Sequence, residues 1–262
     1  MTFAGEIADH YARYRRGFGP AALAFVRERL RAGPDALVVD LGCGTGQLAV
    51  PLSAHVRHVL GVDPEPDMLR HAYAAAGRAG ATGATSWMLG SDADVPGLAG
   101  LLGRSAVQAV TISNAVHFMD TGRLFAGLTD VLAPGGRVAV IANGTPVWLQ
   151  DPAWSRALRR FLGERYGTDA SGSRCTDAAV LARCREDMAA AGLATEQHRL
   201  DLRAAVTPEW LAGNLVSAMP PEWLPADMRE FADAVATAVR SAQPAGGLVE
   251  DVPVTVLAGV RA

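Results

Sequence analysis

The feature that most constrains the fold is a short apolar run that breaks into closely spaced glycines. Residues 37–46 read Leu-Val-Val-Asp-Leu-Gly-Cys-Gly-Thr-Gly, and apolar spacing resumes at Leu48. Such a run suits a strand buried on both faces of a parallel sheet, followed here by a helix from about Gln47. Three glycines in five positions let the backbone adopt positive φ and approach a ligand without a Cβ in the way. The sequence therefore predicts a strand, a ligand-binding loop and a helix, in that order.

Four more apolar segments follow this strand, separated by turn or helix signals. Strands are expected at residues 59–62, 85–89, 107–112 and 137–141, with helices near 67–76 and 121–132. Strands and helices in alternation predict right-handed crossovers and a doubly wound parallel sheet, the Rossmann-like α/β class. Ligands bind such a sheet outside the carboxyl ends of its strands. The glycine loop, Asp63 after the second strand and Asp92 after the third should therefore converge on one crevice.

The rest of the chain adds helices around this core and two late strands. Residues 6–31 predict one or two helices divided by a Gly-Phe-Gly-Pro break, and further helices are expected from Asp151, Thr176 and Thr207 and over 225–242. Residues 196–202 and 252–260 have strand-like patterns. We expect one domain over residues 1–262, with an N-terminal helical cap at 1–33, a cofactor-binding core at 34–142, helical insertions covering the substrate at 143–192 and 203–251, and final strands at 193–202 and 252–262.

Composition excludes several classes of protein. No apolar stretch approaches the roughly 18 residues of a membrane span, and the first residues do not resemble a signal peptide. We therefore expect a cytoplasmic protein that does not bind a membrane. The net charge of -3 argues against nucleic-acid binding. Cys43, Cys175 and Cys184 are far apart with no metal-ligand spacing, so reduced thiols and no bound metal are expected.

All basic residues other than histidine are arginines, because the chain contains no lysine. This excludes a Walker-A phosphate loop and a lysine Schiff base. Residues 44–49, however, read Gly-Thr-Gly-Gln-Leu-Ala and fit the G-x-G-x-x-A form of the dinucleotide fingerprint. Asp63 also lies near the distance at which an acid binds ribose hydroxyls in that motif. The loop considered by itself leaves an NAD-dependent dehydrogenase open as an alternative.

Five segments, taken together, resemble the motifs of the class I S-adenosylmethionine-dependent methyltransferases, in the order in which that family carries them. They are residues 39–46, 61–69, 90–96, 113–120 and 132–137. The segment at 11–18 is similar to a tyrosine- and arginine-containing stretch that precedes the domain in many small-molecule members, of the methyltransferase type 11 or 25 kind. The resemblance implies a seven-stranded sheet with an antiparallel last strand. It also implies S-adenosyl-L-methionine as cofactor and S-adenosyl-L-homocysteine as product.

The resemblance implies roles for individual residues. Asp63 would accept hydrogen bonds from both ribose hydroxyls, and Asp92 would accept one from the adenine amino group, with the Ala93 amide facing a ring nitrogen. Met68 would lie against the purine, with core packing as its alternative. The cofactor carries a sulfonium and an ammonium but no phosphate, so carboxylates rather than lysines should surround it. The expected cofactor-binding residues are Tyr14, Arg15, Asp40, Gly42, Gly44, Gly46, Asp63, Met68, Asp92, Ala93 and Asn114.

His117 is the candidate catalytic base, because it follows the fourth strand on the side where the methyl group should emerge. The alternative is a histidine that only shapes the pocket. The predicted reaction is methyl transfer to an oxygen or nitrogen of a small molecule, a secondary metabolite by family analogy, by a monomer or homodimer. A protein that binds S-adenosylmethionine without transferring its methyl group would carry the same loop and aspartates, and stays open as a second alternative.

Overall fold

The computed structural model describes residues 3–167, 177–243 and 245–262. The chain forms two compact units. The core unit comprises the described residues within Gly17–Asn143, Ser173–Leu200 and Val254–Ala262, and the helical unit comprises those within Met1–Arg16, Gly144–Gly172 and Asp201–Pro253. The expectation of one domain over the whole chain stays a prediction. Thr176, predicted to begin a helix, lies outside the described residues, as does Cys175.

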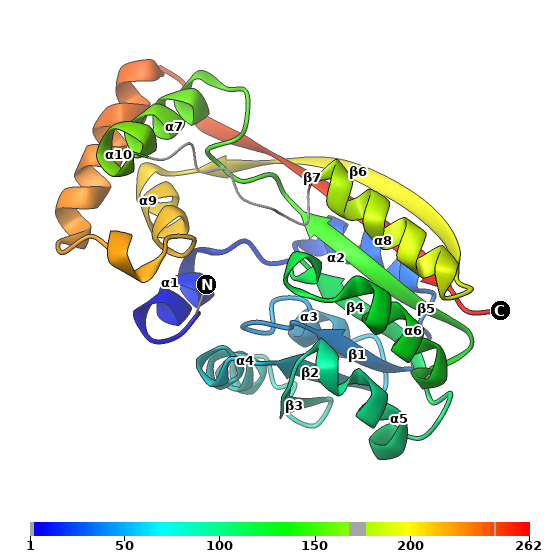
Figure 1. Cartoon of the computed structure of the whole chain (residues 1–262). Coiled ribbons are helices and arrows are strands. Elements are labelled where there is room, and N and C mark those ends of the chain that lie inside the picture. The colour runs from blue at the N-terminus through cyan, green and yellow to red at the C-terminus, as the bar shows by residue number, and fades with distance from the viewer. Residues whose placement is uncertain (1–2, 168–176, 244) are drawn as a thin grey trace. The chain divides into compact units, whose positions relative to one another are not determined.

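A seven-stranded sheet organises the fold, in the order β3-β2-β1-β4-β5-β7-β6. Neighbouring strands among β1 to β5 run parallel, whereas β7 pairs antiparallel with β5. The predicted doubly wound sheet with an antiparallel last strand is therefore confirmed (Figure 1). The strands are β1 (Leu37–Leu41), β2 (His58–Asp63), β3 (Thr85–Leu89), β4 (Val107–Ser113), β5 (Leu132–Asn143), β6 (Ala194–Val206) and β7 (Leu248–Val260).

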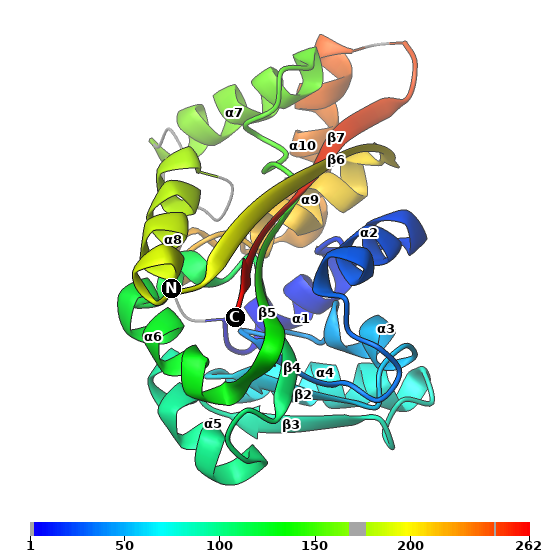
Figure 2. The ribbon, with the colours of Figure 1, turned by 90° about the vertical axis from the view of Figure 1, so that its right-hand side faces the viewer.

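Helices of the core unit cover both faces of the parallel strands. Figure 2 shows α2, α3 and α4 on one face and α5, α6 and α8 on the other. Two of them differ from expectation: α3 is a single short turn that begins at Ala49 rather than Gln47, and α5 was not predicted. The helices are α2 (Pro20–Leu30), α3 (Ala49–Ser53), α4 (Pro66–Arg78), α5 (Val95–Leu102), α6 (Thr121–Val131) and α8 (Ala178–Ala190).

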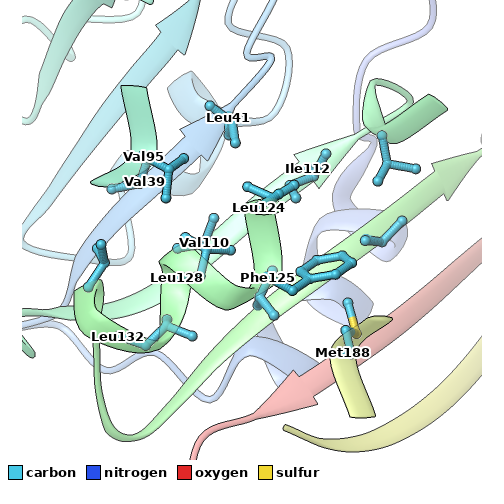
Figure 3. Close-up of a cluster of buried hydrophobic side chains, with 14 of the residues drawn as sticks. Val39, Leu41, Val95, Val110, Ile112, Leu124, Phe125, Leu128, Leu132 and Met188 are labelled. Atoms are coloured by element: carbon cyan, nitrogen blue, oxygen red, sulfur yellow. The ribbon is translucent and has the colours of Figure 1, made fainter. Parts of the chain in front are cut away.

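A large hydrophobic core lies between the sheet and the helices α5, α6 and α8. Figure 3 shows Leu124, Phe125 and Leu128 of α6 directed toward Val110 and Ile112 of β4. Spacings of three and four residues place these α6 side chains on one face of the helix. All five are buried to within 1% of full burial. This packing fixes β1 and β4 and so fixes the strand ends from which the candidate site is built.

The helical unit contains the helices α1 (Glu6–Tyr14), α7 (Ala153–Tyr166), α9 (Pro208–Val216) and α10 (Met228–Ala242), together with the short helix η3 (Pro221–Trp223) and parts of β6 and β7. In it, α10 packs on α7 and α9, and α1 packs on α9. Gly213 makes the second contact possible, because a Cβ there would lie 2.3 Å from ring atoms of Tyr14. Asn214 adds a bond from its Nδ2 to the Tyr14 carbonyl at 3.1 Å. The aromatic residues of the second half of the chain thus form a core of their own, centred on Trp154 and Phe231.

No helix among the described residues combines the length and the apolar character needed to span a membrane. Within the same residues, no group of histidine, cysteine and acidic side chains has the geometry to hold a metal ion. Cys43 and Cys184 are buried free thiols.

Candidate functional site

The glycine loop after β1 folds back over the end of β2. The amides of Gly42 and Cys43 both donate to the Val62 carbonyl, at 2.8 and 3.1 Å. Gly42, Gly44 and Gly46 have φ of 69°, 53° and 77°, in the region that side chains disfavour. The predicted loop is therefore present, and its glycines are required by the backbone conformation.

Gly42 also brings the segment after β4 against the loop. A Cβ on Gly42 would lie 2.6 Å from the Cβ of Ala115 and 3.2 Å from Cε of Met119. Real Cβ contacts are essentially never below 3.0 Å, so any larger residue would displace one of the two segments. The absence of a side chain thus places the short helix η2 (Val116–Phe118), which contains His117, beside the ligand loop.

Asp63 ends β2 and holds the loop in place. Its Oδ2 accepts the Gly44 amide at 2.8 Å, and its Oδ1 accepts the Glu65 amide at 3.0 Å. Burial raises the pKa of Asp63, and the two backbone hydrogen bonds oppose that effect. A carboxylate offers about four acceptor positions, so two bonds leave capacity for a ligand. Sequence reasoning predicted the residue but not its bond to the loop.

Asp40 lies on β1 between Gly61 of β2 and Thr111 of β4 in the register of the sheet. Its side chain is 1% exposed, and the Thr111 hydroxyl donates to Oδ1 at 2.6 Å. Burial raises the pKa of Asp40 to about 7, and the negative charge of Asp63 acts in the same direction, while the Thr111 bond opposes it. The acid at the start of the loop is therefore poised to change its charge near neutral pH.

Asp92 begins the short helix η1 (Asp92–Asp94) that follows β3. Its Oδ2 accepts the Asp120 amide at 3.0 Å, which joins the end of β3 to the segment after β4. The Ala93 amide donates to Ser91 Oγ at 3.3 Å, as part of a capping box between Ser91 and Asp94. An adenine ring nitrogen would have to share or replace this long bond, so the predicted role of the Ala93 amide stays a prediction.

Asn114 joins the ends of β4 and β5. Its amide donates to the Ile141 carbonyl at 2.9 Å, and its Oδ1 accepts the Asn143 amide at 3.0 Å. It does so at a φ of 52°, which is strained for a residue other than glycine. Asn143, whose Nδ2 reaches the Gly17 carbonyl at 3.4 Å, was not among the predicted site residues. Its position as a polar residue at the end of the apolar strand β5 could have identified Asn143 as a candidate site residue.

Three further residues complete the surroundings of the loop. The His117 ring lies 4.0 Å from the ring of Phe118, which is 59% exposed. Met68 on α4 is 3% exposed, which favours core packing over contact with a ligand. Trp87 of β3 lies against the loop, because a Cβ on Gly46 would stand 3.1 Å from its Cη2. Sequence reasoning missed Trp87, because the pattern of a strand does not show which neighbouring segment a side chain will contact.

Comparison with known proteins assigns the segment that holds these residues. Residues 38–136 match the sequence model of the methyltransferase domain family. This segment is therefore similar to methyltransferase domains. The predicted resemblance to the S-adenosylmethionine-dependent family is confirmed for it.

The methyltransferase domain has relatives among curated proteins. An uncharacterized methyltransferase of Mycobacterium bovis is 32% identical over 156 residues, which cover 56% of this chain and 58% of that protein. A ubiquinone/menaquinone biosynthesis C-methyltransferase of Rubrivivax gelatinosus is 31% identical over 121 residues, which cover 45% of this chain and 43% of that protein. The chain thus matches 58% of the length of the first of these relatives and 43% of the second.

Solved structures share the fold over almost the whole chain. The YcgJ protein from Bacillus subtilis has a TM-score of 0.58 at 17% identity, and the match covers 93% of this chain and 99% of that one. Geranyl diphosphate C-methyltransferase from Streptomyces coelicolor has a TM-score of 0.50 at 18% identity, covering 92% and 76%. At 17% and 18% sequence identity, this structural similarity shows that the fold is shared.

Tyr14 and Arg15, the remaining predicted cofactor residues, belong to the helical unit rather than to the unit that contains the methyltransferase domain. Arg15 Nε donates to Ser217 Oγ at 2.8 Å, and burial lowers the pKa of its guanidinium. Tyr14 packs on Gly213, as described above. Both side chains therefore anchor α1 to α9, and their contact with a cofactor stays a prediction.

Proposed function

We propose that this chain transfers a methyl group from S-adenosyl-L-methionine to a small-molecule acceptor. The observation that carries the proposal is the arrangement of acids at consecutive strand ends of the methyltransferase domain. Asp40 lies under the glycine loop, Asp63 accepts the Gly44 amide of that loop, and Asp92 follows β3. These are acceptors for hydroxyl, amino and ammonium groups, which the proposed cofactor carries.

The residues at the loop fit a cationic ligand with hydroxyl groups. Neither Asp40 nor Asp63 forms an ion pair with an arginine in the part of the chain that the structure describes. The Thr45 hydroxyl is buried without a hydrogen-bond partner among those residues, so the loop keeps a polar group for a ligand. A dinucleotide would place its pyrophosphate charge near two acids instead, which disfavours the dehydrogenase alternative.

The bound cofactor supplies a methyl carbon already activated by its sulfonium. What this chain adds is the alignment of acceptor and methyl group and the exclusion of water, which can provide much of the rate. His117, placed beside the loop by the Gly42 contact, is the proposed base for a hydroxyl acceptor. A nitrogen acceptor needs only to arrive uncharged. Transfer to oxygen or nitrogen is the finer part of the proposal; one relative of this chain is a named C-methyltransferase, so carbon is the alternative acceptor atom.

The acceptor is proposed to be an apolar or ring-bearing small molecule, a secondary metabolite by analogy. We propose that the helical insertions at 143–192 and 203–251 recognise it; Trp154 and Phe231 of these insertions pack in the core of the helical unit rather than on its surface. No nucleic acid is expected as a partner. A cytoplasmic monomer or homodimer remains the expected form.

Two measurements test the proposal. Thermal unfolding with S-adenosylhomocysteine or NAD distinguishes the ligands, because a ligand at 100 times its Kd stabilises the fold by about 2.7 kcal/mol. A response to NAD without one to S-adenosylhomocysteine would contradict the proposal. Transfer of a labelled methyl group into small molecules of a cell extract then separates an enzyme from a protein that binds the cofactor without reaction.

A further inference from the structure

The end of β3 and the start of α6 are joined by one hydrogen bond between a side chain and the main chain. Asp92 Oδ2 accepts the amide of Asp120 at 3.0 Å, although the two residues are 28 positions apart. Asp92 begins η1, and Asp120 is the N-terminal cap of α6. The bond thus connects the acid that is expected to accept the adenine amino group to a helix that contributes none of the predicted cofactor residues.

The donor of this bond lies on a rigid support. Asp120 Oδ1 accepts the Arg123 amide at 3.2 Å, and the Asp120 carbonyl accepts the Leu124 amide at 2.9 Å, so two bonds fix the first turn of α6. The hydroxyl of Thr121, which is 3% exposed, donates to Asp187 Oδ2 of α8. The direction of the Asp120 N–H is therefore set by the packing of the core unit and not by a flexible side chain.

A carboxylate that is held at one oxygen presents the other oxygen in a defined direction. Both oxygens of a carboxylate accept hydrogen bonds, so Oδ1 of Asp92 stays available to a ligand while Oδ2 accepts the Asp120 amide. Asp92 is half-buried, and its side chain would otherwise turn about two bonds. The fold thus orders this acceptor before a ligand arrives, which lowers the entropy lost on binding.

We propose that the main-chain amide of Asp120 positions the Asp92 carboxylate and thereby sets the preference of the site for a purine that carries an amino group. The inference rests on the proposed function and deepens it, because it adds a specificity-determining group that does not itself touch the cofactor. An amino group donates a hydrogen bond to a carboxylate oxygen, whereas a purine with only hydrogen at that position offers no such donor. The start of α6 is thus a positioning element for recognition of the base.

A purely structural role for the same bond predicts a different result. An amide that only ties β3 to α6 would, when lost, weaken all adenosine-like ligands by the same factor. An amide that positions Asp92 would, when lost, weaken only the ligands whose base carries the amino group. The ratio of two dissociation constants therefore separates the two roles, and a general loss of stability does not change that ratio.

The backbone at position 120 allows the amide to be removed by a single substitution. Asp120 has a φ of −80°, which proline accepts, and Met119 is extended at φ −111° and ψ 154°, as a residue before proline must be. Asp120→Pro removes the N–H together with the capping side chain, and the proline ring takes the place of the hydrogen. Asp120→Ala is the matched control, because it removes the capping side chain and keeps the N–H.

Isothermal titration calorimetry of the full chain with two probes measures the ratio. S-adenosylhomocysteine carries the amino group, and its purine riboside analogue has only hydrogen at that ring position. The unchanged chain should bind S-adenosylhomocysteine at least about tenfold more tightly than the analogue, as a hydrogen bond to a charged group provides. Asp120→Ala should keep this ratio. Asp120→Pro should lower it about threefold or more, because the Asp92 side chain must then be ordered on binding.

A backbone ester at position 120 gives the same test without a proline ring. It replaces the Asp120 N–H by an oxygen and keeps the capping side chain, so it serves if Asp120→Pro does not fold. Its ratio of dissociation constants should fall as in Asp120→Pro, and an unchanged ratio in the folded ester overturns the inference.

Each remaining outcome counts against a defined claim. An unchanged ratio in folded Asp120→Pro overturns the inference, and so does an equal fall in Asp120→Pro and Asp120→Ala, which would assign the effect to the capping side chain. A ratio near one in the unchanged chain shows that Asp92 does not read the amino group; it overturns the inference and leaves the proposed function standing. A folded, unchanged chain that binds neither probe overturns the proposed function together with the inference.

Discussion

Replacing Asp40 by asparagine should stabilise the ligand-free chain at high pH but not at low pH. The pKa of Asp40 is about 7 in the fold, against an ordinary value of 3.8 for the unfolded chain. The folded state therefore binds this proton more tightly than the unfolded chain does. The contribution of Asp40 to the free energy of unfolding is thus greatest below pH 3.8 and decreases as the pH rises to 7. At 1.36 kcal/mol per pH unit, the loss reaches about 4 kcal/mol at pH 8. Asparagine keeps an oxygen for the Thr111 hydroxyl and carries no charge.

Urea unfolding followed by tryptophan fluorescence at pH 5 and pH 8 measures this effect. The difference in the free energy of unfolding, Asp40→Asn minus the unchanged chain, should be roughly 2 to 3 kcal/mol larger at pH 8 than at pH 5. Asp130→Asn, with an exposed carboxyl, controls for the loss of one negative charge and should gain nothing. If the difference between Asp40→Asn and the unchanged chain is the same at both pH values, the reasoning about Asp40 is refuted.

Three further substitutions test other parts of the site. Asp63→Ala should weaken S-adenosylhomocysteine binding by at least about 30-fold in calorimetry, since charge-assisted hydrogen bonds contribute about 2 kcal/mol or more. His117→Gln should slow methyl transfer to a hydroxyl acceptor by a factor of about 10² or more, in a single-turnover assay, without changing cofactor affinity. Gly42→Ala should lower stability by about 2 kcal/mol in thermal unfolding, because its Cβ would lie 2.6 Å from that of Ala115 at a φ of 69°.

Each of these predictions can fail in a distinct way. Unchanged affinity in Asp63→Ala would remove that carboxylate from the binding site. An unchanged rate in His117→Gln would leave the histidine with a role in shaping the pocket. For Gly42, the control is Gly77→Ala on α4, where a Cβ meets nothing within 4 Å; equal stability of both glycine variants would show that the contact with Ala115 does not matter.

The strand ends were predictable from sequence because apolar runs and the acids or glycines that follow them are local signals. All five parallel strands lie where they were expected, as do Asp63, Asp92 and the antiparallel last strand, although β5 begins at Leu132 and ends at Asn143 instead of covering 137–141. By contrast, α5 was missed because Val95–Leu102 is apolar almost throughout and includes two glycines, so it shows no helical period. The late strands also proved longer than predicted, at 13 residues each.

The contacts that build the site depend on tertiary neighbours, and for that reason no spacing rule could supply them. The bond from Gly44 to Asp63 and the approach of Ala115 to Gly42 join segments far apart in sequence. The raised pKa of Asp40 follows from burial under a loop whose path the sequence does not specify. Arg15 is a similar case, because its bond to Ser217 joins residues far apart in sequence and no local pattern indicated it.

Trp87 gives the ligand loop an optical reporter of its own. Its indole lies 2.5 Å from where a Cβ of Gly61 would stand and 3.1 Å from that of Gly46, so it contacts β2 and the loop at once. The other four tryptophans, at 148, 154, 210 and 223, belong to the helical unit. Emission from Trp87 in a chain whose other tryptophans are replaced by phenylalanine would therefore follow loop movements during ligand binding in real time, without an attached dye.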